Sequence, residues 1–162
     1  MKRAVRSSTY IIMGLLALSS AQAQVLLSEQ QISLDAAQTV ATATLEQCRA
    51  DGYQVSVAVL DRGGNLRIAL RDDGAGLHTV DSARRKAYTA LTFRTPSSEF
   101  AGRVADTPAL TEFEGVLALG GGLPIEAGDE VVGAVGVGGA PGGDLDEACA
   151  QAGLTALQEA LQ

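Results

Sequence analysis

The only histidine in the chain, His78, opens a stretch of residues that could bind an anion or a metal ion. The stretch reads RDDGAGLHTVDSARRKAYTALTF, residues 71–93, and the cations Arg84, Arg85 and Lys86 follow the histidine within two helical turns. A neutral imidazole ligates iron, and a cationic side chain pairs with a carboxylate. The combination points to a flat anion that carries iron, such as haem, with His78 on the metal and Arg84 or Lys86 on a propionate.

The same residues have a structural interpretation, which the sequence leaves open. A lone histidine beside a helix is commonly a solvated loop or capping residue, and a run of cations is commonly a solvated helix face. Arg85 lies nearly opposite the apolar stripe and is expected to point into solvent, whereas Arg84 and Lys86 flank the stripe and are expected to place their charges at its rim. Tyr53 and Tyr88 are alternative oxygen ligands for iron.

The two cysteines, Cys48 and Cys149, each fall on the apolar stripe of an expected helix. They are either two buried free thiols or a disulfide, and the sequence does not decide between the two. A bridge would close a loop of about 100 residues and contribute up to ~4.7 kcal/mol on a chain-entropy estimate. Metal binding by two isolated cysteines is not expected, because the chain has neither CxxC nor HxxxH spacing.

Other motifs of nucleotide binding or catalysis are incomplete. The glycine-rich run GAVGVGGAPGG, residues 133–143, has Pro141 where a dinucleotide-binding fingerprint needs its last glycine, and the helix after it begins with acidic residues. We interpret these glycines as positions of close packing and turning. There is no Walker loop and no G-x-S-x-G motif. The acidic residues at 72–73 and 144–146 fit a turn and a helix start, although hydrolysis by paired carboxylates stays open.

Residues 1–23 have the organisation of a secretory signal peptide. Basic residues precede the apolar run YIIMGLLAL, which is shorter than the ~20 residues that a membrane span needs, and AQA supplies small residues before a cleavage point at Gln24. We expect a periplasmic or secreted protein, with no membrane attachment after cleavage and with residues 24–162 forming one domain. The net charge of −7 argues against a nucleic-acid partner.

The expected secondary structure positions the histidine segment against a sheet. Apolar residues of the helix that follows His78 are mostly small, so this helix can lie close to a sheet. Together the elements predict one five-stranded antiparallel sheet packed with helices, an α/β (α+β) fold. Helices are expected at 33–52, 78–93, 97–104 and 144–162, and strands in a hairpin within 53–71 and at 116–119, 123–126 and 131–137.

Three ordered blocks of the sequence resemble a known family. They are the D-x-G-G-x-L turn at 61–66, the segment KAYTA at 86–90, and the run GGLPIEAGDEVVGAVGV at 121–137. Over about residues 32–160 the chain resembles the GlcG/HbpS-like family, the DUF336 domains that include the C-terminal part of PduO cobalamin adenosyltransferases. Asp146 matches the acid with which the family opens its last helix.

The resemblance implies a profilin-like fold, homo-oligomers and haem binding. It implies an exported haem-binding protein with an accessory or sensory role and without turnover of its own. The alternatives are a module that binds a small hydroxy acid or related metabolite, and a haem-degrading enzyme. The expected binding residues, with His78 as the metal ligand, are His78, Thr79, Arg84, Lys86, Tyr88, Gly121 and Gly122.

Overall fold

The computed structural model describes residues 27–161, so the signal peptide predicted for residues 1–23 lies outside the described residues. The elements follow one another in the order α1 (Leu34–Ala50), β1 (Ser56–Asp61), β2 (Leu66–Arg71), α2 (Thr79–Phe93), α3 (Ser97–Asp106), the 3-10 helix η1 (Pro108–Glu112), β3 (Gly122–Ala127), β4 (Glu130–Gly138) and α4 (Gly143–Ala160).

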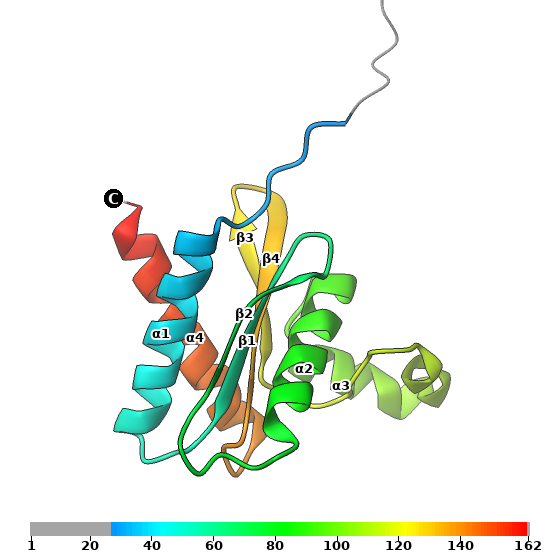
Figure 1. Ribbon diagram of the computed structural model, residues 1–162. Helices are drawn as coiled ribbons and strands as arrows, with labels where there is room; N and C mark the ends of the chain where they lie inside the picture. Colours follow the sequence, from blue (N-terminus) through cyan, green and yellow to red (C-terminus); the bar gives the residue numbers. More distant parts are fainter. Residues whose placement is uncertain (1–26, 162) are drawn as a thin grey trace, which may run out of the picture.

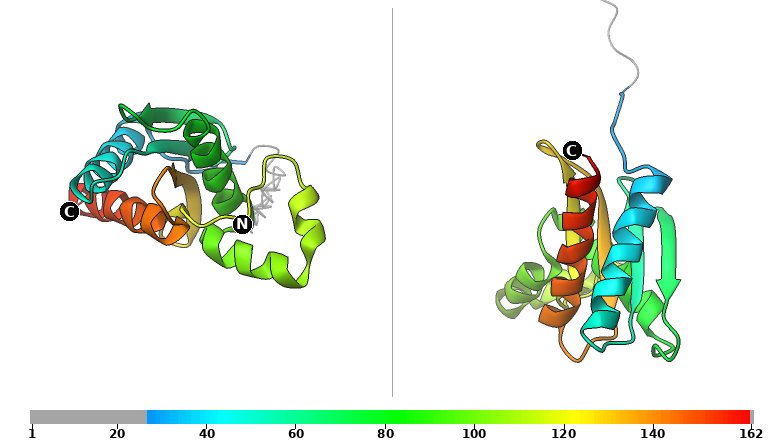
Figure 2. Two further views of the ribbon diagram at one scale, coloured as in Figure 1. Left: turned by 90° about the horizontal axis from the view of Figure 1, so that it is seen from below. Right: turned by 90° about the vertical axis from the view of Figure 1, so that its left-hand side faces the viewer.

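The strands form one antiparallel sheet in the order β2-β1-β4-β3, in which β1 pairs with β4 and so joins the two hairpins. Helices α1 and α4 lie on one face and α2 on the other, with α3 and η1 projecting to the side (Figure 1). Figure 2 shows α1 and α4 running side by side. The central strand β1 is buried along its whole length, because helices cover both of its faces. The predicted α/β class is confirmed.

Local sequence signals explain where α1 and the first hairpin begin and end. The Ser33 hydroxyl accepts a hydrogen bond from the Ala36 N–H at 3.1 Å and caps α1, while Gly52, with φ +85°, reverses the chain after it. In the turn between β1 and β2, the Asp61 carboxylate accepts the backbone N–H groups of Gly63 and Asn65, both at 3.0 Å. These contacts confirm the predicted helix and hairpin.

Glycines of β4 let α2 lie directly on the sheet. A Cβ built at Gly136 would collide with the backbone oxygen of Ala83, and one at Gly138 would collide with the Ser82 hydroxyl. The facing residues of α2 include Ala83 and Ala87, which are fully buried. Small residues on both sides therefore set the distance between α2 and β4, as the sequence predicted for this helix.

The sheet has four strands rather than the expected five, because residues 116–119 do not pair with it. The Leu117 N–H donates to the Thr89 hydroxyl at 2.9 Å, and the guanidinium of Arg85 donates to the Val116 carbonyl at 2.7 Å. The backbone of this segment is thus satisfied by side chains of α2, by Ser97 of α3 and by local turns, and not by a neighbouring strand. The short apolar run that suggested a strand is only partly buried: Val116 is buried and Leu119 is exposed.

Cys48 and Cys149 form a disulfide between α1 and α4, with their Cα atoms 5.4 Å apart. This outcome decides between the two interpretations that the sequence left open. The bridge lies in the larger core cluster, which α1 and α4 form with Val57, Val135 and other residues of the sheet. Within residues 27–161, no helix is long and apolar enough to cross a membrane.

We predict that Gly136→Ala destabilises the protein by about 1–3 kcal/mol, because the added methyl group forces α2 away from β4. Gly102→Ala is the matched control, since Gly102 lies in α3 with nothing within 4 Å of a built Cβ. The measurement is the free energy of unfolding from denaturant titration. Equal effects of the two substitutions would contradict the close packing described for Gly136.

Candidate functional site

A cavity of about 660 Å³ lies where the α2 N-terminus, the α4 N-terminus and the loop after α1 come together. Its volume falls within the roughly 300–1,000 Å³ that is usual for small-molecule sites. It is lined by Gly52, Tyr53, Gln54, Gly74, Gly76, His78, Thr79, Ser82, Lys86, Leu119, Gly120, Gly139, Ala140, Pro141, Gly142, Gly143 and Asp146.

One face of α2 supplies three of the lining side chains. Thr79, Ser82 and Lys86 recur at helical spacing and therefore point the same way. The buried Thr79 hydroxyl donates to the Gly76 carbonyl and shares a second hydrogen bond with the Ser56 hydroxyl, both at 2.7 Å. Thr79 thus holds the start of α2 against β1 and forms a fixed part of the cavity wall.

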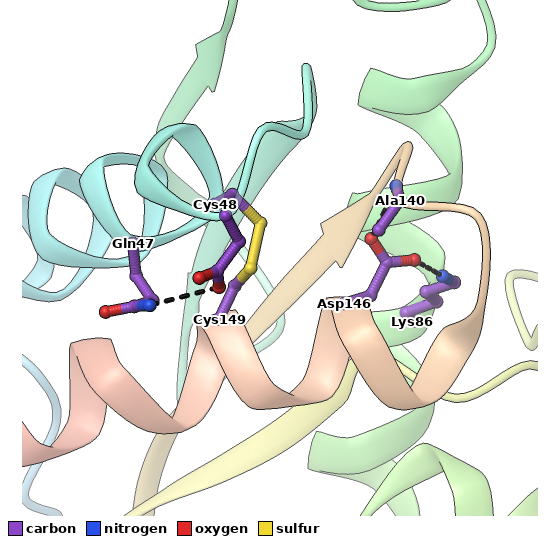
Figure 3. The surroundings of a disulfide bond; sticks show 7 residues. Gln47, Cys48, Lys86, Ala140, Asp146 and Cys149 are labelled. Atoms are coloured by element: carbon purple, nitrogen blue, oxygen red, sulfur yellow. Dashed lines mark hydrogen bonds and ion pairs between the residues drawn. A yellow bond between two sulfur atoms is a disulfide. The ribbon is translucent and has the colours of Figure 1, made fainter.

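Lys86 forms a buried ion pair with Asp146 of α4. Its Nζ lies 2.6 Å from Oδ2 of Asp146, and the two side chains are 6% and 3% exposed. The other oxygen, Oδ1, accepts the Ala140 N–H at 3.0 Å, so one carboxylate holds both a cation and the loop before α4 (Figure 3). The expectation that Lys86 places its charge at the rim of the apolar stripe is wrong. The buried face of α2 is wider than the stripe and includes Thr79 and Lys86.

Burial raises the pKa of the Asp146 carboxyl, because a charged group loses hydration in the protein interior. The hydrogen bond and the charge of Lys86 act in the opposite direction, as does the Ala140 N–H. The Asp146 carboxylate therefore binds a proton more readily than a carboxylate in water does, and it lies in direct contact with the Lys86 amine.

His78 stands at the N-terminus of α2, where its side chain is exposed and makes no capping hydrogen bond. It lines the cavity, so its imidazole is available to a bound molecule. The loop before it is held to α1 by Arg49, whose guanidinium reaches the Asp72 carboxylate at 2.6 Å and lowers the pKa of that carboxyl. Among residues 27–161 there is no group of three side chains that could hold a metal ion by itself.

The other cations of α2 lie away from the cavity. Arg84 makes an exposed 3.2 Å contact with Asp81, one turn earlier. Arg85 was expected in solvent, but its guanidinium instead binds the Val116 carbonyl. Tyr88 lines separate cavities on the far side of α2, whereas Tyr53 lines the main one.

Gly121 and Gly122 are buried behind the ion pair and do not line the main cavity. Gly121 has φ +115°, and a Cβ there would lie 2.7 Å from Cβ of Asp146 and 3.0 Å from Nζ of Lys86. A Cβ at Gly122 would collide with the Lys86 carbonyl. Gly121 thus makes room for the side chains of the pair, and Gly122 makes room for the backbone of Lys86. Of the three consecutive glycines 120–122, Gly120 lines the cavity.

The contact of Asp146 with Lys86 was not predicted from the sequence. Its position in the first turn of α4 had a sufficient explanation in the helix dipole. Its partner lies 60 residues earlier in the chain, so no local spacing signals the pair. Tyr53 was named as an alternative iron ligand and does line the cavity, but Gln54 and the loop at 139–143 were missed, since tertiary packing alone places them there.

Known proteins match the chain over most of its length. The family model described as "Haem degrading protein HbpS-like" matches residues 32–155. HbpS, with a crystal structure, is 45% identical, with a TM-score of 0.80 over 84% of this chain and 96% of HbpS. ORFY from Klebsiella pneumoniae is 30% identical, with a TM-score of 0.77 over 83% of this chain and 95% of ORFY. The GlcG protein of Escherichia coli (strain K12) is 31% identical over 70% of this chain and 82% of GlcG.

These matches agree with the blocks that carried the resemblance in the sequence, since residues 61–66, 86–90 and 121–137 all lie inside the matched range. They also agree with the fold, because the similarity to HbpS extends over nearly the whole described chain. The protein is a member of the HbpS-like family.

Proposed function

We propose that this protein is an exported haem-binding protein. The observation that carries the proposal is the cavity of about 660 Å³ with an exposed imidazole, His78, at its edge. The description of the matched family, which names haem degradation, supports haem as the ligand. Haem needs only one or two axial ligands from the protein, so the absence of a larger metal-ligating cluster among residues 27–161 does not oppose it.

His78 is the residue that would ligate the iron, through a neutral imidazole nitrogen. Arg84, which the sequence also offered for a propionate, does not line the cavity and makes an exposed contact with Asp81 instead, so we leave it out of the proposed haem site. Lys86 is less suited to a propionate than the sequence indicated, since Asp146 already neutralises it. Tyr53, Ala140 and other lining residues would contact the flat faces of the ring.

Bound haem would supply redox chemistry at its iron. The described residues hold no general base beside the cavity other than His78 and Asp146, so we propose binding, with an accessory or sensory role, as the main function. Haem degradation is the second candidate, because the matched family carries that description. Product analysis of the haem complex with a reductant present separates the two.

Export and self-association are part of the proposal. The Cys48–Cys149 disulfide supports an oxidising compartment, in which such bonds persist. Leu77 and Phe113 are 88% and 59% exposed, and contacts between copies of the chain would bury such apolar side chains. We propose a periplasmic or secreted homo-oligomer.

Titration of the purified protein with haemin should give a shifted Soret band, and His78→Ala should change the spectrum of the complex because the iron loses its axial ligand. Arg103→Gln, on the surface of α3, is the matched control and should leave the spectrum unchanged. An unchanged spectrum in His78→Ala would remove His78 from the site. The absence of any Soret shift would refute haem binding.

Expression of the full chain in a Gram-negative host should yield a periplasmic protein whose N-terminus is Gln24, because the peptidase reads the small residues before it. Alkylation in denaturant without reductant should leave both Cys48 and Cys149 unlabelled, and Cys48→Ser should expose one thiol to the reagent. A cytoplasmic protein that retains residues 1–23, with two reactive thiols, would contradict export.

A further inference from the structure

The described part of the protein has one lysine, and that lysine is buried in the cavity wall. The whole sequence contains two lysines, Lys2 and Lys86, whereas all its other cations are arginines. Exposed positions are occupied by arginine, for example Arg49, Arg94 and Arg103. Among the described residues, the one buried cationic side chain is therefore a primary amine, and burial of its charge costs free energy.

The Lys86 amine is buried but faces open space. Its side chain is 6% exposed, yet it lines the cavity of about 660 Å³. An ammonium has three N–H donors, and within residues 27–161 only Asp146 accepts one from Nζ. Two donors are left without a described acceptor, and Lys86 lines the cavity, so we infer that a small molecule that enters the cavity can reach Nζ.

An ion pair at this depth is weakly explained by stability alone. Apolar residues of similar volume often replace a buried pair at no cost in free energy. A buried lysine beside a carboxylate has a chemical use that arginine lacks, because an amine can lose its proton and act as a nucleophile, whereas a guanidinium stays protonated. Asp146 can accept that proton, because its Oδ2 lies 2.6 Å from Nζ of Lys86.

We propose that Lys86 captures a small aldehyde as an imine inside this cavity. Lys86 passes a proton from Nζ to Asp146, and the neutral amine attacks the carbonyl carbon as the carbonyl π bond breaks. A second proton then moves from the nitrogen to the former carbonyl oxygen, which gives a carbinolamine. Asp146 returns the proton to the departing hydroxyl, one water leaves, and the carbon–nitrogen double bond forms. No oxidant or reductant is needed, and hydrolysis reverses the sequence of steps.

The cavity suits this role in size and in polarity. Ser82 lies one turn before Lys86 on the same face of α2, and its hydroxyl donates to the Thr79 carbonyl at 3.1 Å, which leaves its oxygen lone pairs for a bound group. Gly120 keeps the opposite wall free of side-chain bulk. The inference does not rest on haem binding, since a Soret titration needs no aldehyde and imine formation needs no haem.

The test is reductive trapping of the full chain with propionaldehyde and cyanoborohydride at neutral pH. Intact mass and peptide mapping locate each propyl group, which separates Lys86 from Lys2 and from the N-terminal amine. Arg103→Lys supplies a matched, exposed lysine on α3 that keeps the net charge. We expect Lys86 to be modified about tenfold faster than this introduced amine, because the site positions the carbonyl and accepts the proton.

Lys86→Arg should lose the adduct at position 86 while labelling elsewhere continues, and circular dichroism checks that this variant is folded. If Lys86→Arg does not fold, the Arg103→Lys variant still tests the proposal. In that variant the labelling rates of Lys86 and of the introduced lysine are compared within one native protein. The proposal would be overturned if Lys86 reacts no faster than the introduced amine. It would also be overturned if Lys86 reacts only in denaturant while the introduced amine is labelled in the native protein.

Discussion

The ion pair between Lys86 and Asp146 joins the two helix layers at one end of the sheet. Lys86 comes from α2 on one face of the sheet, and Asp146 comes from α4 on the opposite face (Figure 1). The same carboxylate also binds the Ala140 N–H, which fixes the loop after β4. Because both partners are almost fully buried, neither tolerates loss of the other, and the geometry of the cavity depends on the two remaining together.

Small residues elsewhere serve this arrangement. Gly136 lets α2 rest on β4, Gly122 lets the α2 backbone at Lys86 lie against β3, and Gly121 leaves the space that the pair occupies. The disulfide at Cys149 lies one turn after Asp146 on α4 and anchors that helix to α1. The glycines of residues 120–143 therefore have separate roles. Gly121 leaves room for the buried pair, Gly136 and Gly138 bring α2 close to β4, and Gly120, Gly139, Gly142 and Gly143 line the cavity without side-chain bulk.

Periodicity and local caps predicted most of the fold, because the relevant contacts lie within one turn or one hairpin. Ser33 caps α1 and Asp61 organises its turn through neighbours in sequence. Residues 116–119 do not form a strand, and side chains of α2 and α3 satisfy part of their backbone. The site was less predictable: His78 and Thr79, named from the sequence, line the cavity, but the partner of Lys86 lies far along the chain and leaves no local pattern.

A double-mutant cycle on the pair tests the account most directly. Lys86→Met and Asp146→Asn should each lower the free energy of unfolding by about 3–5 kcal/mol, because each leaves a buried polar or charged group without its partner. The double variant should lose much less than the two single losses together, since neither charge remains and the amide oxygen can still accept the Ala140 N–H. Additive losses would contradict the claim that these two residues act as one unit at the base of the cavity.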